Sequence, residues 1–160
     1  MLAIKYHHLR ALIYRPYLCH LLLVHDPAAN FNEVNWALIS SYERTCINEA
    51  RETARLLYGI SSKEDLVHNF PWWQMISCLV CASSILLVSS IFALASQESS
   101  SDFDTQGLLD DAETCLKVFD ALSVDSPGAR IARDMMKALK DCGARWSKPP
   151  GQFFSPPDED

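Results

Sequence analysis

The longest apolar run of the chain lies near its middle and carries no charged residue. From Leu66 to Gln97 the sequence contains no Asp, Glu, Lys or Arg. A run of this length is too long for a β-strand and predicts a helix. Past Gln74 its polar side chains are serines, and at ~100° per residue they fall on every side of that helix. Because it has no polar face, the helix must be surrounded by protein or by lipid.

An uncharged run of this length is also long enough to cross a bilayer, and Trp72 and Trp73 at its start would suit a membrane interface. Against that interpretation, the run holds many serines, and acidic residues such as Glu64 and Glu98 flank both of its ends. Every other predicted helix is amphipathic and needs an apolar partner. We therefore expect a buried core helix, and the alternative is a single-span membrane protein built on residues 75–95.

Four further helices are predicted from apolar positions that recur every three or four residues. The first begins near Ala3, and Pro16 should kink or end it, because proline removes a backbone donor and clashes with the preceding turn. Polar, Pro-containing or Ser-rich segments separate the helices. The second is expected at about Asn32–Tyr58, with Gly59 directly after it. The other two are expected at about Thr105–Leu122 and from Pro127 to Gly143, which should end the helix.

Individual side chains indicate where some of these helices begin and which of their faces are buried. Asp104 and Ser126 are good N-caps, and Pro127 suits the first turn of a helix. The first helix carries an apolar stripe whose cover we expect from helices that precede it, so that without them it would be an exposed patch. That stripe comprises Leu2, Tyr6, Leu9, Ile13 and Tyr17. The apolar face of the last helix is expected at Ile131, Met135, Leu139 and Cys142, with Arg130, Arg133, Lys137 and Lys140 on its wet sides.

No alternating strand pattern and no internal repeat occurs, so the fold class is all-α, with about five helices around the long uncharged helix. We expect one helical domain over residues 1–146. Residues 147–160 are Pro-rich and then acidic, and we expect this tail to be disordered. Its Phe153-Phe154 pair beside acidic residues also has the composition of some activation segments, although a plain tail is favoured.

The composition fits one globular domain and restricts its function. A chain of 160 residues is enough to bury a core. The formal net charge of −6 argues against sequence-independent binding to nucleic acid, which needs a basic surface. The six cysteines lie mostly on apolar helix faces, and the first residues lack the pattern of a secretory signal. We therefore expect reduced cysteines and an intracellular protein.

The sequence contains no readable constellation of catalytic or metal-binding residues. Cys78 and Cys81 have CxxC spacing, but they lie inside the apolar run, where core packing is the favoured interpretation. His7 and His8 diverge by ~100° on a helix and cannot share a metal ion. No Gly-x-Ser-x-Gly motif and no Gly-rich phosphate loop occurs. We expect this chain to be neither an enzyme nor the holder of a cofactor.

Five short motifs follow one another along about Ala3–Gly143. The first is a Tyr-His-x-Leu-x-x-Leu-x-x-Arg-Pro segment. Together the five resemble the fungal-specific transcription factor regulatory domain, which is the middle homology region of the Zn2Cys6 binuclear-cluster regulators. The residues that carry the resemblance are Tyr6, His7, Leu9, Arg15 and Pro16; Cys46 and Ala50; Pro71, Trp72 and Trp73; Cys115 and Leu116; and Ser126, Pro127, Ala129 and Arg130.

The resemblance implies an all-helical domain in the nucleus that regulates RNA polymerase II transcription, with its central helix buried and its motif residues in structural positions. Its expected contacts are protein partners or the earlier half of the regulatory domain, to whose later part this chain would correspond. In such regulators a separate zinc cluster with two Cys-x2-Cys-x6-Cys sets binds DNA, and these cysteines do not provide it. We therefore expect no structural zinc, poor DNA binding and no membrane association.

Overall fold

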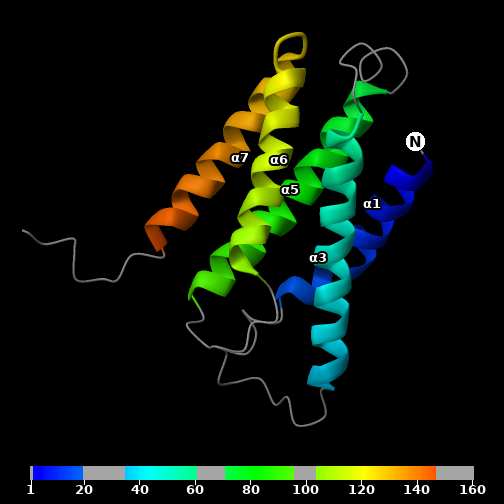
Figure 1. Cartoon of the computed structure of the whole chain (residues 1–160), viewed down its shortest axis with the longest axis vertical. Helices are drawn as coiled ribbons and strands as arrows, with labels where there is room; N and C mark the ends of the chain where they lie inside the picture. The colour runs from blue at the N-terminus through cyan, green and yellow to red at the C-terminus, as the bar shows by residue number, and fades with distance from the viewer. Residues whose placement is uncertain (1, 20–34, 61–70, 96–103, 147–160) are drawn as a thin grey trace, which may run out of the picture.

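The computed structural model describes residues 2–19, 35–60, 71–95 and 104–146. Within these ranges every regular element is helical, which confirms the predicted all-α class (Figure 1). Five α-helices and one 3₁₀ turn make up the described part of the chain. They are α1 (Leu2–Tyr14), the 3₁₀ turn η1 (Arg15–Cys19), α3 (Trp36–Tyr58), α5 (Trp72–Ala95), α6 (Thr105–Leu122) and α7 (Pro127–Trp146).

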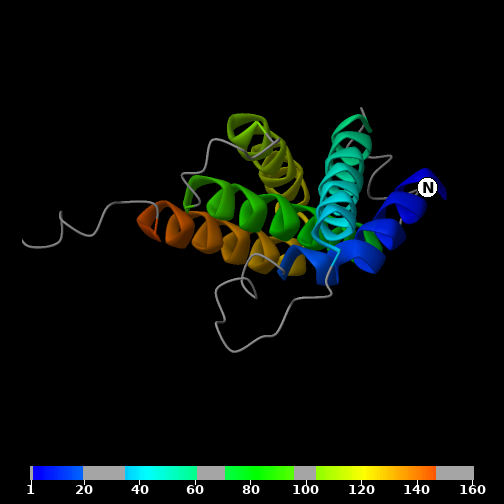
Figure 2. The same cartoon turned by 90° about the horizontal axis from the view of Figure 1, so that it is seen from below.

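Helix α5 lies in the middle and contacts each of the other four α-helices. Helices α1 and α7 form the two outer edges of the arrangement (Figure 1). The end-on view shows α3 and α6 on one side of α5, with α1 and α7 toward the other (Figure 2). The uncharged helix is therefore packed among the other helices, as the sequence predicted.

The segment Trp73–Leu94 of α5 is long and apolar enough to cross a membrane, judged by length and composition, and 61% of its most apolar window is buried inside the protein. Its apolar side chains meet the buried faces of the neighbouring helices. Leu79, Ile85 and Leu86 of α5 are fully buried, and so are Leu57 of α3 and Phe119 of α6. These contacts give the apolar helix a protein environment on most of its circumference.

Two of the three buried serines of α5, Ser83 and Ser90, bond to their own helix, whereas the buried hydroxyl of Ser89 has no hydrogen-bond partner among the described residues. Ser83 donates to the carbonyl of Leu79 at 2.7 Å, and Ser90 donates to the carbonyl of Leu87 at 2.8 Å. Such back-bonding to the preceding turn satisfies a buried hydroxyl locally. The many serines that weakened the membrane interpretation are thus compatible with a dry protein core.

Capping residues set the helix ends much as predicted. The Asp104 carboxylate accepts from the N–H of Gln106 at 3.1 Å, and the Ser126 hydroxyl accepts from the N–H of Ala129 at 3.2 Å. Helix α1 gives way to the 3₁₀ turn at Arg15–Cys19, which contains Pro16. Each cap satisfies a backbone donor that the first turn of a helix leaves without a partner.

Two predicted helix boundaries differ from the structure, and the predictions for three segments lie outside the described residues. Helix α3 begins at Trp36, where Asn35 caps it by accepting from the N–H of Leu38 at 3.1 Å. Gly143 does not end α7, which continues to Trp146. A Cβ at Gly143 would lie 2.3 Å from a side-chain carbon of Ile91, so this glycine allows α7 to approach α5 closely. The segments 20–34, 61–70 and 147–160, with their predicted loop, turn and disordered tail, are not among the described residues.

The predicted apolar face of α7 is wrong in its orientation. Ile131 and Met135 are 63% and 61% exposed, and only Leu139 of the predicted set packs against the core. A narrow seam of small or flexible residues, Ala129, Ala132 and Met136, is buried instead. In this orientation the basic side chains Arg133, Lys137 and Lys140 of α7 form ion pairs with α6.

The burial of α5 yields a first prediction. Leu86→Lys places an unpaired charge at a fully buried site, and we expect it to lower the free energy of unfolding by about 4 kcal/mol or more. Leu94→Lys is the matched control, because Leu94 lies on the same helix and is 45% exposed. Chemical denaturation followed by circular dichroism measures both. Equal stability of the two variants would contradict the described packing of α5.

Candidate functional site

Helix α1 is fixed to α3 by a group of polar side chains around Glu49. One carboxylate oxygen of Glu49 lies 2.6 Å from His7 Nδ1, and the other lies 3.0 Å from Arg10 Nη1. Arg10 also donates to the hydroxyl of Tyr6 at 2.9 Å and lies over its ring. The Tyr6 hydroxyl, followed by the Glu49 charge, raises the pKa of Arg10. Glu49 itself is buried, and Arg10 supplies its charged partner while His7 lies within hydrogen-bond distance of its other oxygen.

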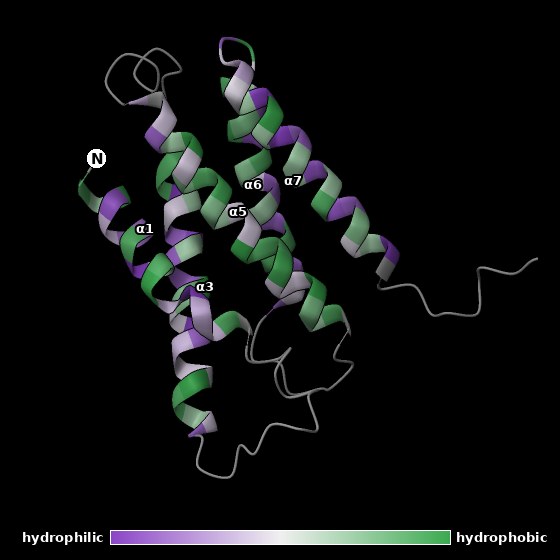
Figure 3. Ribbon diagram, turned by 180° about the vertical axis from the view of Figure 1, so that it is seen from behind, coloured by the Kyte–Doolittle hydropathy of each residue, from purple (hydrophilic) through white to green (hydrophobic). Residues whose placement is uncertain are grey.

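The opposite face of α1 is apolar and exposed. Leu2, Leu9 and Ile13 are 83%, 57% and 65% exposed, and Tyr6 and Leu12 are exposed beside them. The inner face of the same helix is also apolar, with Ile4 and Ala11 buried against the core. Figure 3 shows hydrophobic turns along α1, at the edge of the arrangement. We call Leu2, Tyr6, Leu9, Leu12 and Ile13 the α1 outer face.

The first two motifs of the family resemblance meet at the contact between α1 and α3. Cys46 is fully buried, and its thiol donates to the carbonyl of Ala11 at 3.4 Å. Ala50, one turn further along α3, is also fully buried. His7 joins this contact through Glu49, whereas Leu9 lies on the α1 outer face. Residues 35 or more positions apart in sequence thus form one anchored helix pair.

The other motif residues lie elsewhere and do not join this contact into one site. Arg15 and Pro16 are exposed in η1. The carbonyl of Pro71 accepts from the N–H groups of Gln74 and Met75 at the start of α5, where Trp72 begins the helix and Trp73 is exposed. At the start of α7, Ser126 caps the helix and Pro127 is its first residue. Ala129 is buried. Arg130 is exposed, and its guanidinium lies 3.4 Å from the carbonyl of Ser123.

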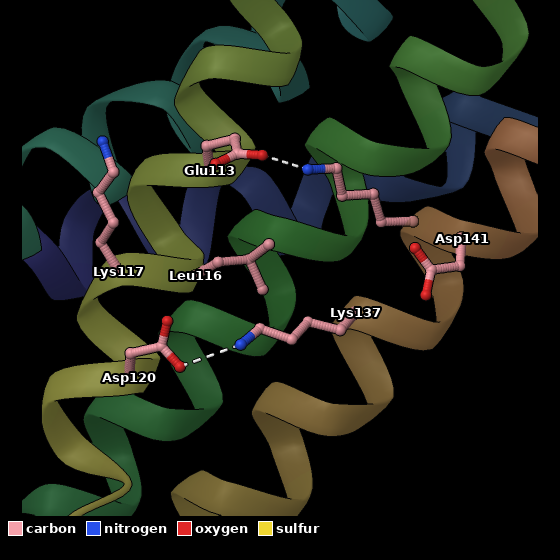
Figure 4. A pocket seen from close by; sticks show the side chains of 7 residues that line it. Glu113, Leu116, Lys117, Asp120, Lys137 and Asp141 are labelled. Atoms are coloured by element: carbon pink, nitrogen blue, oxygen red, sulfur yellow. Dashed lines mark hydrogen bonds and ion pairs between the residues drawn. The ribbon is translucent and has the colours of Figure 1, made fainter.

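A shallow depression of about 380 Å³ lies between α6 and α7, and four of its charged residues form two ion pairs across it (Figure 4). Lys137 donates to Asp120 at 3.1 Å, and Lys140 donates to Glu113. The hydrogen bond and charge of Lys140 lower the pKa of Glu113. Arg133 adds a contact of 3.4 Å with Asp120. Arg133, Lys137 and Lys140 lie on the solvent-accessible sides of α7, as expected, and there they pair with carboxylates of α6.

Burial raises the pKa of the core cysteine thiols and so lowers their reactivity. Burial raises the pKa of Cys46 and of Cys115 to about 12 and that of Cys78 to about 11, and it raises the pKa of Cys81 as well. Because the thiolate is the reactive form, these side chains are protonated and unreactive near neutral pH. The structure thereby confirms that the CxxC pair, Cys78 and Cys81, packs in the core.

Among residues 2–19, 35–60, 71–95 and 104–146, no group of three or more His, Cys, Asp or Glu side chains lies close enough together to hold a metal ion. The buried hydroxyls of Ser83 and Ser90 donate to backbone carbonyls rather than to a base. The α1 outer face is an exposed apolar patch in the described part of the chain.

Comparison of the chain with protein-family models, with curated proteins and with solved structures finds no match in any of the three.

The sequence alone did not single out Glu49. Its position between Cys46 and Ala50, both on the buried stripe, is the signal that could have found it. A charge at the border of a buried stripe requires partners from another helix. The basic and imidazole side chains of the expected first helix were the candidates for that role.

The contacts of Glu49 yield a second prediction. Glu49→Ala removes the shared partner of His7 and Arg10, and we expect a loss of about 1–3 kcal/mol in the free energy of unfolding. Glu52→Ala is the matched control on the same helix, because its pair with Arg55 is exposed and is worth less than about 0.5 kcal/mol. Urea denaturation compares the two variants. A Glu49 variant as stable as the control would show that this group does not anchor α1.

Proposed function

We propose that this chain is the regulatory and interaction region of a fungal Zn2Cys6-type transcription factor and acts in the nucleus on RNA polymerase II transcription. It is a binding module and not a catalyst. It carries no zinc cluster of its own, so it reaches DNA only through a separate DNA-binding domain. The support for the family comes from the five ordered motifs, and the support for an interaction role comes from the surface of α1.

The observation that carries the proposal is that α1 is apolar on two opposite faces. The inner face, with Ile4 and Ala11, packs on the core, and the Glu49 contacts hold it there. The outer face, with Leu9 and Ile13, lies in solvent. A helix that is apolar on all sides is stable when it is buried on all sides. The α1 outer face is therefore the surface at which a protein partner, or the earlier half of such a domain, binds.

A reporter experiment tests the proposal. The chain is fused to a heterologous DNA-binding domain in yeast, and the output of a promoter with matching sites is compared with that of the DNA-binding domain alone. We expect the fusion to change the output and Leu9→Glu with Ile13→Glu to abolish the change, because two charges on the α1 outer face prevent apolar contact.

The matched control is Asn48→Glu, which adds a charge at an exposed position of α3 and should leave the output unchanged. Protein levels are measured for every fusion, so that loss of the chain is not read as loss of function. Identical output from the fusion and from the DNA-binding domain alone would refute the transcriptional role.

A further inference from the structure

Helix α7 has an exposed apolar stripe that matches the α1 outer face. It consists of Ile131, Met135, Ala138 and Cys142, all of which are exposed. The inner side of α7 is occupied by Ala129, Ala132, Met136 and Gly143 against α5. The described part of the chain therefore has an exposed apolar stripe on each of its two edge helices.

The two stripes have the same length and spacing. Leu2, Tyr6, Leu9 and Ile13 of α1 follow an i, i+4, i+7, i+11 pattern, and the four residues of the α7 stripe follow the same pattern. This spacing gives a nearly straight seam of about three helical turns, which suits packing of one helix against another. Seams of equal length can bury each other completely.

One pair of charges beside the stripes, Lys5 and Asp141, is complementary. Lys5 flanks the α1 outer face, and the sequence has no acidic residue before Asp26. Asp134 and Asp141 flank the α7 stripe, but Asp134 is already paired with Arg133 at 2.8 Å. On a helical projection Lys5 and Asp141 lie on the same side of their stripes, at about 70–90° from the centre, and Arg145 lies on that side one turn beyond Asp141. Residues on the same side of two seams come together when the helices run antiparallel. When the two stripes overlap along their whole length in this antiparallel orientation, Lys5 lies close to Asp141.

Self-pairing of one stripe does not satisfy both helices. Two α1 outer faces packed together would bring lysine toward lysine, and no carboxylate of either α1 could compensate. Two α7 stripes packed together would leave both α1 outer faces in water. Only contact between unlike stripes covers the apolar surface of both edge helices and pairs opposite charges at the same time.

We propose that the occupant of the α1 outer face is the α7 stripe of a second copy of this chain, packed antiparallel. Such a contact is heterologous: each copy uses a different surface, and each assembled pair still has one free α1 and one free α7. The assembly is therefore open and grows head to tail with concentration. One helix against one helix is a small interface, so the association is weak and reversible.

The inference rests on the proposal that the α1 outer face is an interaction surface, and it does not require a role in transcription. A mixing experiment tests it. One variant, Leu9→Glu with Ile13→Glu, blocks the α1 outer face, and another, Ile131→Glu with Met135→Glu, blocks the α7 stripe. Sedimentation velocity is recorded for the wild type, for each variant, and for an equimolar mixture, up to high micromolar concentration.

We expect the wild type to form a concentration-dependent series of oligomers and each variant alone to be monomeric. The mixture should form a 1:1 dimer and nothing larger, because one intact α7 stripe meets one intact α1 outer face and both remaining surfaces are blocked. A monomeric wild type, a variant that still self-associates, or a mixture that stays monomeric would each overturn the proposal. Cooperative thermal unfolding confirms that the variants are folded.

A charge exchange tests the antiparallel register. Lys5→Glu should weaken the association at least several-fold, because it places two carboxylates together. Adding Asp141→Lys to the same chain should restore it, since the pair is then reversed in sign. Failure of the second change to restore association would overturn this register.

The outcomes separate this inference from the proposed function. If the wild type is monomeric while the α1 variant still loses its reporter effect, then another partner binds the α1 outer face and the second copy is refuted. If the mixture forms the 1:1 dimer and the reporter does not respond, then the head-to-tail contact stands and the transcriptional role is refuted.

Discussion

The structure depends on the need to cover one long uncharged helix. Helix α5 has no polar face, and its buried serines Ser83 and Ser90 bond back to their own backbone, so its contacts with other helices are mainly apolar. Its four neighbours meet this need with their apolar faces, while polar anchors between those neighbours fix their orientations. Glu49 holds α1 to α3, and the ion pairs of Asp120 and Glu113 hold α7 to α6. The hydrophobic contacts supply most of the stabilisation, and the polar contacts choose which face of each helix turns inward.

The division between hydrophobic and polar contacts explains how the exposed apolar stripes of α1 and α7 arise. Helix α7 approaches α5 through small residues, and Gly143 lies directly against Ile91. The close approach, together with the pairing of Arg133, Lys137 and Lys140 with α6, leaves the larger apolar side chains of α7 outside. On α1 the same result follows from Glu49, which binds His7 and Arg10 and so points the opposite, leucine-rich face to solvent. The exposed apolar residues at both edges therefore accompany the way in which the core is covered.

Sequence reasoning predicted the helices well, because periodicity and capping are local. The limits of α6 and the start of α7 followed from Asp104, Ser126 and Pro127. Sequence reasoning predicted less well which face of a helix is buried. Helices α1 and α7 each carry more than one apolar stripe, and periodicity cannot rank the stripes without the partner helix. Gly143 was taken as a helix end because a glycine that terminates a helix and a glycine that permits close packing look alike in sequence. Glu49 was missed because its partners come from another helix.

The central claim is that protein, and not lipid, covers α5. Cells that express the tagged chain can be lysed, and their membranes extracted with alkaline carbonate and then floated on a density gradient, so that aggregates sink while membranes rise. The account predicts that the chain is absent from the carbonate-washed, floating membranes and is recovered without detergent. A chain that floats with the membranes and is released only by detergent would contradict it, because Trp73–Leu94 would then be spanning a bilayer.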